Sequence, residues 1–380
     1  MVLFSDDGSP TPAIDWCYIT ITADQVAELL ESLRKNILDA LELKSGGVRE
    51  FYDAEPAAVA EKKGRLPKPR KVSDKICRLA LEKLTKVGRR IDSSLFDSDR
   101  DPVQRQRALR LRRRLRDLSR SKRLRLQILS ADVSVPWNLM YDGHTDAKPD
   151  PELFWGFRHI IEELPYRAQT PAVEALSRQG GLLLGLNLNR NNLKHALIEP
   201  QVKVLSQRVT LIKERTSEAE VLDMLSLKQD HGRIEYFYCH AGADGTRTTG
   251  YEQSYLGMTS ATQGLTLEDI NLAAYGLSFQ DRPLFILNAC ESAQMDGRFY
   301  DGFVPRLLKM GAAAVVGTEC KVPEVLGAHL GLRLVEGLLD GDPLGETLRS
   351  ARLDFLEKYN NPFGLLYRSF GNSDVHFVPS

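Results

Sequence analysis

Cysteine is scarce in this chain of 380 residues, and long apolar runs are missing. The cysteines stand at positions 17, 77, 239, 290 and 320, an odd number with no C-x-x-C pair among them. We therefore expect no disulfide framework, no zinc site or other cofactor, and a reducing cytoplasm as the location. No apolar stretch approaches the roughly 18 to 20 residues that span a bilayer. The N-terminal residues lack the basic start and apolar middle of a signal peptide.

Net charge is also absent, because 51 basic residues balance 51 acidic ones. This balance argues against a chain that as a whole binds nucleic acid or a membrane surface. The sequence shows no repeat of roughly 20 to 50 residues, so a solenoid or a TPR array is not supported. Apolar residues make up 42% of the chain, which is enough for a substantial core. The length suits two or three domains, or one large α/β domain with an appendage.

Helical spacing marks the N-terminal part of the chain. Apolar residues recur at helical intervals over 23–43 and over 74–87, which predicts a helix in each range. Between them, the lysines, prolines and glycine of 61–71 indicate a linker. We therefore expect residues 1–84 to form a mostly helical region that could contact a sensor or a partner.

Arginine is concentrated between residues 105 and 125. Within this block Ala108, Leu111 and Leu115 keep the spacing of one helix face, which predicts an amphipathic helix with a solvated basic face. Residues 124–128 then alternate between apolar and polar, as in a strand. Arginine also binds phosphate and carboxylate groups through paired N–H donors. A surface for an anion, a nucleotide or an acidic partner is therefore the alternative to a purely structural face.

From residue 180 onward, predicted strands alternate with predicted helices. Short apolar runs indicate strands at 182–186, 234–239, 284–287 and 312–316. Two capping patterns open helices, and further helices are predicted at 304–310, 323–339 and 343–359; the caps are Ser217-x-x-Glu220 and Thr266-x-x-Asp269. The polar stretch at 241–264 is predicted to be a loop. This alternation predicts an α/β fold with a mainly parallel sheet covered by helices on both faces.

Two of these strands end in residues that can do chemistry together. His240 follows the strand at 234–239, and Cys290 comes shortly after the strand at 284–287. A thiol needs a base to become a nucleophile at neutral pH, and the carboxyl ends of neighbouring parallel strands can bring the two together. Histidine first, with a gap of 290 − 240 = 50 residues to a cysteine in an Ala-Cys context, is the pattern of a caspase-like cysteine peptidase.

Each residue alone has a plainer interpretation. A cysteine at the end of a buried strand is usually packed in the core, and a histidine there is usually a hydrogen-bonded structural residue. The order, the spacing and the matching strand ends together favour His240 as the base and Cys290 as the nucleophile. Cys239 should point to the opposite strand face from His240, which favours packing in the core.

Neighbouring residues complete the predicted site. The backbone N–H groups of Cys290, Ala241 and Gly242 are candidate donors for an oxyanion hole, the last two from a turn. Asn288 should share a strand face with Cys290, so it is a candidate wall of the substrate pocket, together with Glu291.

Several segments of the chain resemble the CHAT family of caspase-like peptidases, in the clan of caspases, separase and legumain. The motif V-P-W-N-L-M-Y-D at 135–142 is similar to the family's Pro-Trp-Glu-Leu-Leu-Tyr-Asp, with Asn138 in place of the usual glutamate. The segments 154–165, 311–317, 322–323 and 341–352 resemble the passages that follow it in the family. The resemblance covers roughly residues 85 to 380.

The resemblance implies a caspase-like three-layer α/β/α sandwich and a cysteine endopeptidase with His240 as base and Cys290 as nucleophile. Residues 85–175 would form a degenerate, non-catalytic half, and residues 176–380 the catalytic half. Members of the family are largely bacterial and often serve regulated proteolysis in anti-phage defence or programmed cell death. A partner or sensor typically switches them on, and the stretch at 241–264 is the segment we expect to become ordered on activation.

Two alternatives stay open beside a peptidase with a protein substrate and an activating partner protein. The first is a catalytically silent scaffold of the same fold, which selective alkylation of Cys290 would argue against. The second is a nucleotide or nucleic-acid sensor built on 105–125, whose binding would weaken as salt rises.

Overall fold

A computed structural model of the chain describes residues 50–97, 101–130, 135–143, 148–165, 175–176, 183–228, 230–244, 253–289, 302–319 and 322–378, with a few positions between 25 and 36. Those few positions are helical, in agreement with the helix predicted at 23–43. None of the helices in this part of the chain is long and apolar enough to cross a membrane.

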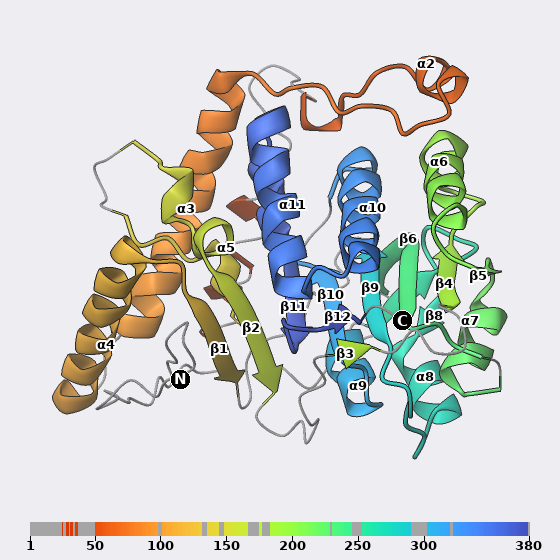
Figure 1. The fold of residues 1–380 in the computed structure, drawn as a ribbon. Helices are drawn as coiled ribbons and strands as arrows, with labels where there is room; N and C mark the ends of the chain where they lie inside the picture. The colour runs from red at the N-terminus through yellow and green to blue at the C-terminus, as the bar shows by residue number, and fades with distance from the viewer. Residues whose placement is uncertain are drawn as a thin grey trace.

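A ten-stranded sheet forms the centre of the molecule (Figure 1). The strands of the chain are β1 (Arg125–Ser130), β2 (Ile160–Pro165), β3 (Ala175–Leu176), β4 (Leu183–Leu188), β5 (Leu211–Arg215), β6 (Ile234–Asp244), β7 (Gln253–Gly257), β8 (Leu265–Thr266), β9 (Leu284–Ala289), β10 (Ala314–Thr318), β11 (Tyr367–Gly371) and β12 (His376–Phe377). Along its main path the order is β1-β2-β11-β10-β9-β6-β4-β5, and all neighbours are parallel except β10 and β11. β7 pairs antiparallel with the end of β6, and β8 with β7, while β3 and β12 form a separate pair.

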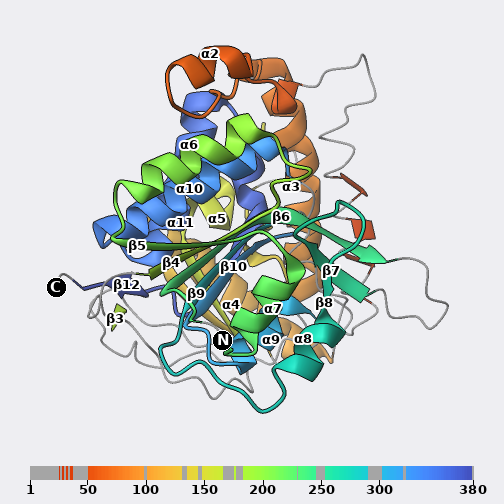
Figure 2. The same ribbon diagram turned by 90° about the vertical axis from the view of Figure 1, so that its right-hand side faces the viewer.

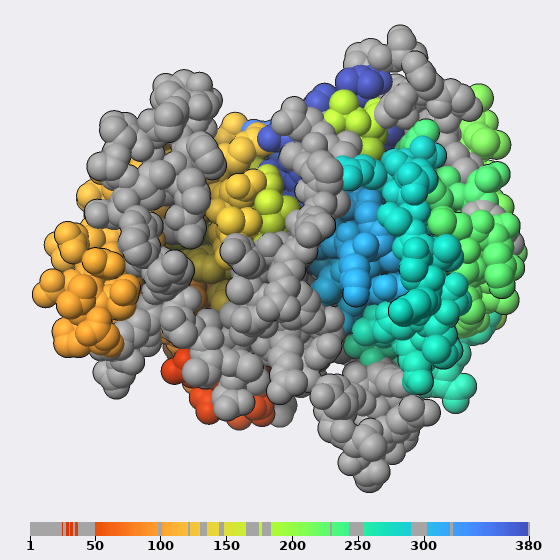
Figure 3. Space-filling model, turned by 90° about the horizontal axis from the view of Figure 1, so that it is seen from below, coloured from red at the N-terminus to blue at the C-terminus, as the bar shows by residue number. Residues whose placement is uncertain are grey.

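Helices cover both faces of this sheet. They are α2 (Ala57–Lys62), α3 (Asp74–Phe96), α4 (Pro102–Ser121), α5 (Trp155–Arg158), α6 (His195–Ser206), α7 (Glu218–Leu225), α8 (Leu267–Ala273), α9 (Phe303–Lys309), α10 (Glu324–Asp340) and α11 (Leu344–Tyr359). Short 3₁₀ turns lie at Glu50–Tyr52, Trp137–Leu139, Pro151–Leu153 and Pro362–Leu366. α6, α10 and α11 lie above the sheet and α7, α8 and α9 below it (Figure 2). The view from below shows α4 at one end of the molecule and α7 and α8 at the other (Figure 3).

Two apolar clusters fill the spaces between these layers. Tyr236 and Ile286 belong to the cluster that packs against α10 and α11. Phe237 and Leu287, the next residues along β6 and β9, belong to the cluster that packs against α7, α8 and α9. Successive side chains of a strand point to opposite faces, so both strands carry apolar side chains on both faces because both faces are covered. The prediction of a three-layer α/β/α sandwich with a mainly parallel sheet is confirmed.

Local signals set the starts of two helices as predicted. Ser217 caps α7 by accepting a hydrogen bond from the backbone N–H of Glu220, whose carboxylate accepts from the backbone of Ser217 in return. Thr266 and Asp269 form the same reciprocal arrangement at the start of α8. These capping boxes satisfy backbone N–H groups that have no partner within the helix.

The structure differs from the sequence-based predictions where distant segments pair. The strand predicted at 234–239 continues to Asp244, because β7 returns antiparallel and pairs with its last five residues. Ala241 and Gly242 therefore lie in a strand and not in a turn, and the loop predicted at 241–264 contains β7. Residues 245–252 of that stretch lie outside the described residues. The helix predicted at 74–87 continues to Phe96.

Strands β2, β5 and β11 were not predicted. β11, the last strand of the large sheet in sequence order, lies between β2 and β10 and joins the two predicted halves of the chain. The proposed division of the chain at residues 84 and 175 stays a prediction.

Candidate active site

The candidate site lies where β6 and β9 run side by side. Tyr238 lies opposite Asn288, and Cys239 lies opposite Ala289. His240 follows Cys239 directly, and its side chain is partly exposed. Cys290 follows Ala289 in the sequence but, like Glu291, lies outside the described residues. The residue before the predicted base and the residue before the predicted nucleophile are thus in register on neighbouring strands.

Cys239 is buried below the sheet in the cluster that contains Phe237 and Ala289. Because successive side chains of a strand alternate, His240 shares the opposite face with Tyr236 and Tyr238. This arrangement confirms the prediction that Cys239 packs in the core.

The strand that pairs with His240 is anchored by a buried asparagine. Asn189 follows β4 directly, is fully buried, and donates its backbone N–H to the Tyr238 carbonyl at 3.0 Å. Its side-chain Nδ2 donates to the carbonyl of Gly257 at 2.8 Å, and Gly257 lies opposite His240. Asn189 therefore holds β7 along the edge of β6 that faces β4. The opposite edge of β6, which faces β9, is the one on which the candidate site lies beyond Cys239.

Glycine at position 242 fits closely against its partner strand. Gly242 lies opposite Tyr255, whose hydroxyl donates to the Ala261 carbonyl at 3.0 Å. A Cβ at position 242 would lie 2.7 Å from that hydroxyl oxygen, which is a steric clash. The small residues after His240 thus fit the close approach of β7.

Asn288 lies in the core and not at an open surface. Its side chain is 3% exposed. Its Nδ2 donates to the Tyr236 hydroxyl at 2.9 Å and to the Gly327 carbonyl at 2.7 Å, while its Oδ1 accepts from the Tyr367 hydroxyl at 2.6 Å. The structure does not support the predicted pocket wall at this residue, because α10 packs directly against the side-chain amide of Asn288. That close approach depends on Gly331, where a Cβ would collide with Tyr236 and Asn288.

The sequence analysis did not predict a hydrogen bond that holds the end of β9. The β9–β10 ladder ends at the pair Ile286–Val316. Farther along β10, Thr318 is fully buried, and its hydroxyl donates a hydrogen bond of 2.7 Å to the carbonyl of Ala289. Thr318 and Asn189 each come at the end of an apolar strand, the same signal that drew attention to His240.

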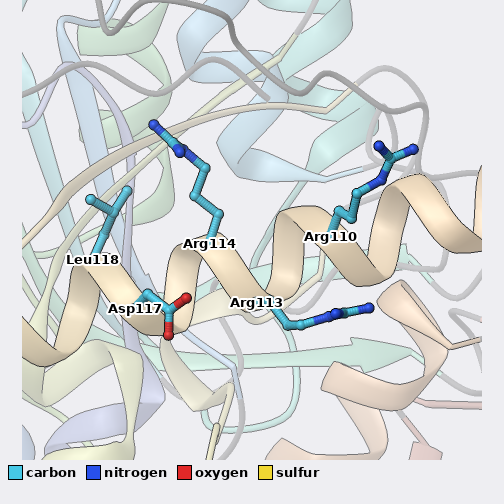
Figure 4. A pocket seen from close by; sticks show the side chains of 5 residues that line it. All are labelled: Arg110, Arg113, Arg114, Asp117 and Leu118. Atoms are coloured by element: carbon cyan, nitrogen blue, oxygen red, sulfur yellow. The ribbon is translucent and has the colours of Figure 1, made fainter.

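The arginine block forms α4 and confirms the predicted amphipathic helix. Ala108, Leu111 and Leu115 are buried, and Arg112 and Arg116 pair with the buried Asp92 of α3. The exposed face carries a shallow depression (Figure 4); its lining residues are Arg110, Arg113, Arg114, Asp117 and Leu118. All five come from α4 itself, and the predicted anion or nucleotide surface is not tested by this geometry.

Comparison with known proteins decides the family. Residues 93–367 match the model of the CHAT domain. The chain belongs to the CHAT family. This membership agrees with the resemblance of the motifs to that family and with the α/β/α architecture.

Relatives of this CHAT chain include a longer bacterial protein. A probable protease of Vitiosangium sp. (strain GDMCC 1.1324) is 28% identical over 245 residues, which are 60% of this chain and 30% of the relative. The CHAT chain therefore spans about a third of the length of that relative.

Two solved structures are similar to most of the chain at low identity. Saccharomyces cerevisiae separase in its complex with securin gives a TM-score of 0.42 at 14% identity, covering 92% of this chain and 23% of separase. The complex of pro- and mature domains of Porphyromonas gingivalis RgpB gives a TM-score of 0.45 at 9% identity, covering 92% of this chain and 77% of the other.

Proposed function

We propose that this CHAT chain is a cysteine endopeptidase that cleaves a protein substrate, with Cys290 as nucleophile and His240 as general base. The register of β6 and β9 carries the proposal. Cys239 and Ala289, the residues immediately before the two catalytic groups, lie opposite each other on adjacent parallel strands. Adjacent strands are about 4.8 Å apart, and His240 and Cys290 each come one residue after this matched pair in the sequence.

The chemistry follows from the two side chains. The imidazole of His240 accepts the proton of the Cys290 thiol, and the thiolate sulfur forms a bond to the carbonyl carbon of the substrate. The π electrons of that carbonyl move to its oxygen. When the carbonyl re-forms, the C–N bond breaks and the departing amine takes the proton from His240. Water then hydrolyses the thioester and regenerates the thiol.

The oxyanion needs N–H donors near the end of β9. The backbone N–H of Cys290 is the first proposed donor. Consecutive residues of an antiparallel strand direct their N–H groups to opposite edges, and β7 lies on the β4 edge of β6. Of the backbone N–H groups of Ala241 and Gly242, one is therefore directed toward the edge of β6 that faces β9. That N–H is the second proposed donor. Glu291 stays a proposed contact of the substrate pocket.

Activity and thiol reactivity test the assignment together. Purified chain is incubated with a proteome-derived peptide library, and Cys290→Ala and His240→Ala should each abolish cleavage while far-UV circular dichroism stays unchanged. Iodoacetamide labelling with mass mapping at pH 7 should modify Cys290 first, and His240→Ala should slow that labelling. Cys77 is the internal control, because burial raises the pKa of its thiol to about 11 and keeps it protonated.

Two results would contradict the proposal. Cleavage that survives Cys290→Ala would remove the nucleophile assignment. Labelling of Cys290 no faster than that of Cys77 would favour the catalytically silent scaffold.

We also propose that a partner or sensor protein activates the enzyme, in bacterial anti-phage defence or programmed cell death and in the cytoplasm. Family membership supports this part of the proposal. A partner encoded beside the gene should raise the rate of peptide cleavage by the wild-type chain and leave Cys290→Ala inactive. Equal rates with and without every neighbouring product would argue against it.

A further inference from the structure

We propose that Asn189 is a positioning residue for His240, the proposed general base. The inference deepens the proposed function and rests on it, because it names the side chain that fixes the strand opposite His240. It starts from two hydrogen bonds made by this one buried residue. The backbone N–H of Asn189 donates to the Tyr238 carbonyl at 3.0 Å, and its Nδ2 donates to the Gly257 carbonyl at 2.8 Å.

β6 exchanges one partner strand for another immediately before His240. Its parallel pairing with β4 ends at Tyr238, and its antiparallel pairing with β7 begins at His240, which lies opposite Gly257. Only Cys239 separates these two ladders along β6. Asn189 follows β4 directly and fills this junction, because it bonds to the last β6 residue of one ladder and to the first pair of the other.

The side-chain amide of Asn189 uses its full hydrogen-bonding capacity at this junction. Its Nδ2 donates to the Gly257 carbonyl and, at 3.2 Å, to the Ser260 carbonyl. Its Oδ1 accepts from the backbone N–H groups of Asn191 and Asn192 at 3.2 and 2.9 Å. An amide has two N–H donors and an acceptor oxygen with two lone pairs, so asparagine matches all four backbone groups. Asn189 is fully buried, so water does not take over these bonds.

β7 depends on this anchor because its own ladders are short. It pairs with five residues of β6 on one side and with two residues of β8 on the other. Glu218 holds the turn that follows β7, since its Oε1 accepts from two backbone N–H groups there at 3.0 and 2.9 Å. The bond from Asn189 to Gly257 is the contact that lies directly opposite His240.

The placement of the base controls the rate of proton transfer. A general base must lie within hydrogen-bond reach of the proton that it accepts, and a misplacement of about 1 Å can cost about 100-fold in rate. The direction of a strand side chain follows its backbone, so the pairing at Gly257 sets where the imidazole of His240 lies. Asn189 therefore acts on proton transfer through the backbone.

Two buried asparagines of one chain segment provide the variant and its matched control. Asn189→Ala removes the four side-chain hydrogen bonds. With the peptide selected from the library, its kcat should fall about 10- to 100-fold while KM stays within about threefold, because the base is displaced and the substrate contacts are not. Asn187 is also fully buried, two residues earlier, but its amide bonds to Glu235 and Arg215. Asn187→Ala should keep kcat within about twofold of wild type.

The ring signal of His240 gives a second readout that needs neither substrate nor nucleophile. In NMR spectra of protein with ¹³C-labelled histidine, the Cε1–Hε1 signal of His240 is the one that disappears in His240→Ala. Asn189→Ala should shift or broaden this signal, because the ring no longer keeps one position. The signal of the buried His159 should stay in place and show that the fold is intact. Asn187→Ala should leave both signals unchanged.

The inference is overturned if either kcat or the His240 signal of Asn189→Ala stays as in wild type, or if Asn187→Ala changes them equally. If thermal melting shows that the alanine variant does not fold, Asn189→Asp replaces it. That variant keeps an acceptor oxygen for the loop after β4 and loses the donors to Gly257 and Ser260. Failure of the proposed function is a separate result, because it would appear as cleavage that survives Cys290→Ala, whereas the His240 signal tests the role of Asn189 directly.

Discussion

A buried histidine far from the active site should make the stability of the protein depend on pH. His159 follows α5, is fully buried, and accepts a hydrogen bond of 3.1 Å on Nδ1 from the backbone N–H of Leu124. Its ring contacts Trp155 edge-on, and its Nε2 has no hydrogen-bond partner. Burial, together with the smaller effect of the positive charges of Arg158 and Arg349, lowers the pKa of His159 from 6.5 to about 3.

The sign and size of the effect follow from proton linkage. The folded state keeps His159 neutral down to about pH 3, whereas the unfolded chain takes up a proton below pH 6.5. The full contribution of His159 to stability is therefore present above pH 6.5 and is lost as the pH falls toward 3. Each pH unit in that window costs about 1.4 kcal/mol, so the free energy of unfolding should fall by about 2 kcal/mol between pH 8 and pH 5.

His159→Asn isolates this contribution. Asparagine can accept the hydrogen bond from Leu124 through its Oδ1, but it does not titrate. Urea unfolding followed by circular dichroism at pH 5 to 8 gives the difference in unfolding free energy between wild type and variant. That difference should shrink by about 2 kcal/mol from pH 8 to pH 5. A difference for His159→Asn that stays constant with pH would refute the reasoning.

Two further predictions concern buried charges. Arg352 is buried and donates hydrogen bonds to the backbone carbonyls of Gly156 and Tyr367. Burial lowers the pKa of Arg352 to about 9. The side chain of Asn138 donates to the same Tyr367 carbonyl, while its Oδ1 lacks a hydrogen-bond partner. Asn138→Glu would place a carboxylate beside the Arg352 guanidinium, so it should raise the free energy of unfolding by about 1 to 2 kcal/mol in urea titrations. A less stable variant would contradict an ion pair between Glu at position 138 and Arg352. Arg368 forms ion pairs with Glu163 and Glu319, and all three side chains are buried. Arg368→Met should therefore lower the free energy of unfolding by about 3 to 5 kcal/mol. Changing both glutamates to glutamine in that variant should recover part of the loss, and no recovery would show that the unpaired charges are not the cause.

Features encoded within a few residues were predictable from the sequence. The caps of α7 and α8 depend on two side chains three residues apart, so the four-residue patterns at Ser217 and Thr266 sufficed. The opposite orientations of Cys239 and His240 needed only the alternation of a strand. The central strands were recognised because most side chains on both of their faces are apolar.

Features that depend on distant partners were not predictable. β6 extends past His240 because β7 pairs with it, and no pattern within 241–244 indicates that pairing. The amide of Asn288 is buried because Tyr367, 79 positions away, bonds to it from another strand. The hydroxyl of Thr318 reaches Ala289 across 29 positions. A single sequence does not show which of several polar side chains at strand ends will meet.

The position of β11 has a consequence for how the protein is made. Synthesis runs from the N-terminus, so β1 and β2 leave the ribosome long before the strand that connects them to β10 exists. The edges of β2 and β10 that face each other stay unpaired until residues 367–371 have emerged from the ribosome. Late, long-range strand pairing is slow and leaves sheet edges open to association with other chains. A chain that ends before residue 367 would therefore leave the facing edges of β2 and β10 without their shared partner strand.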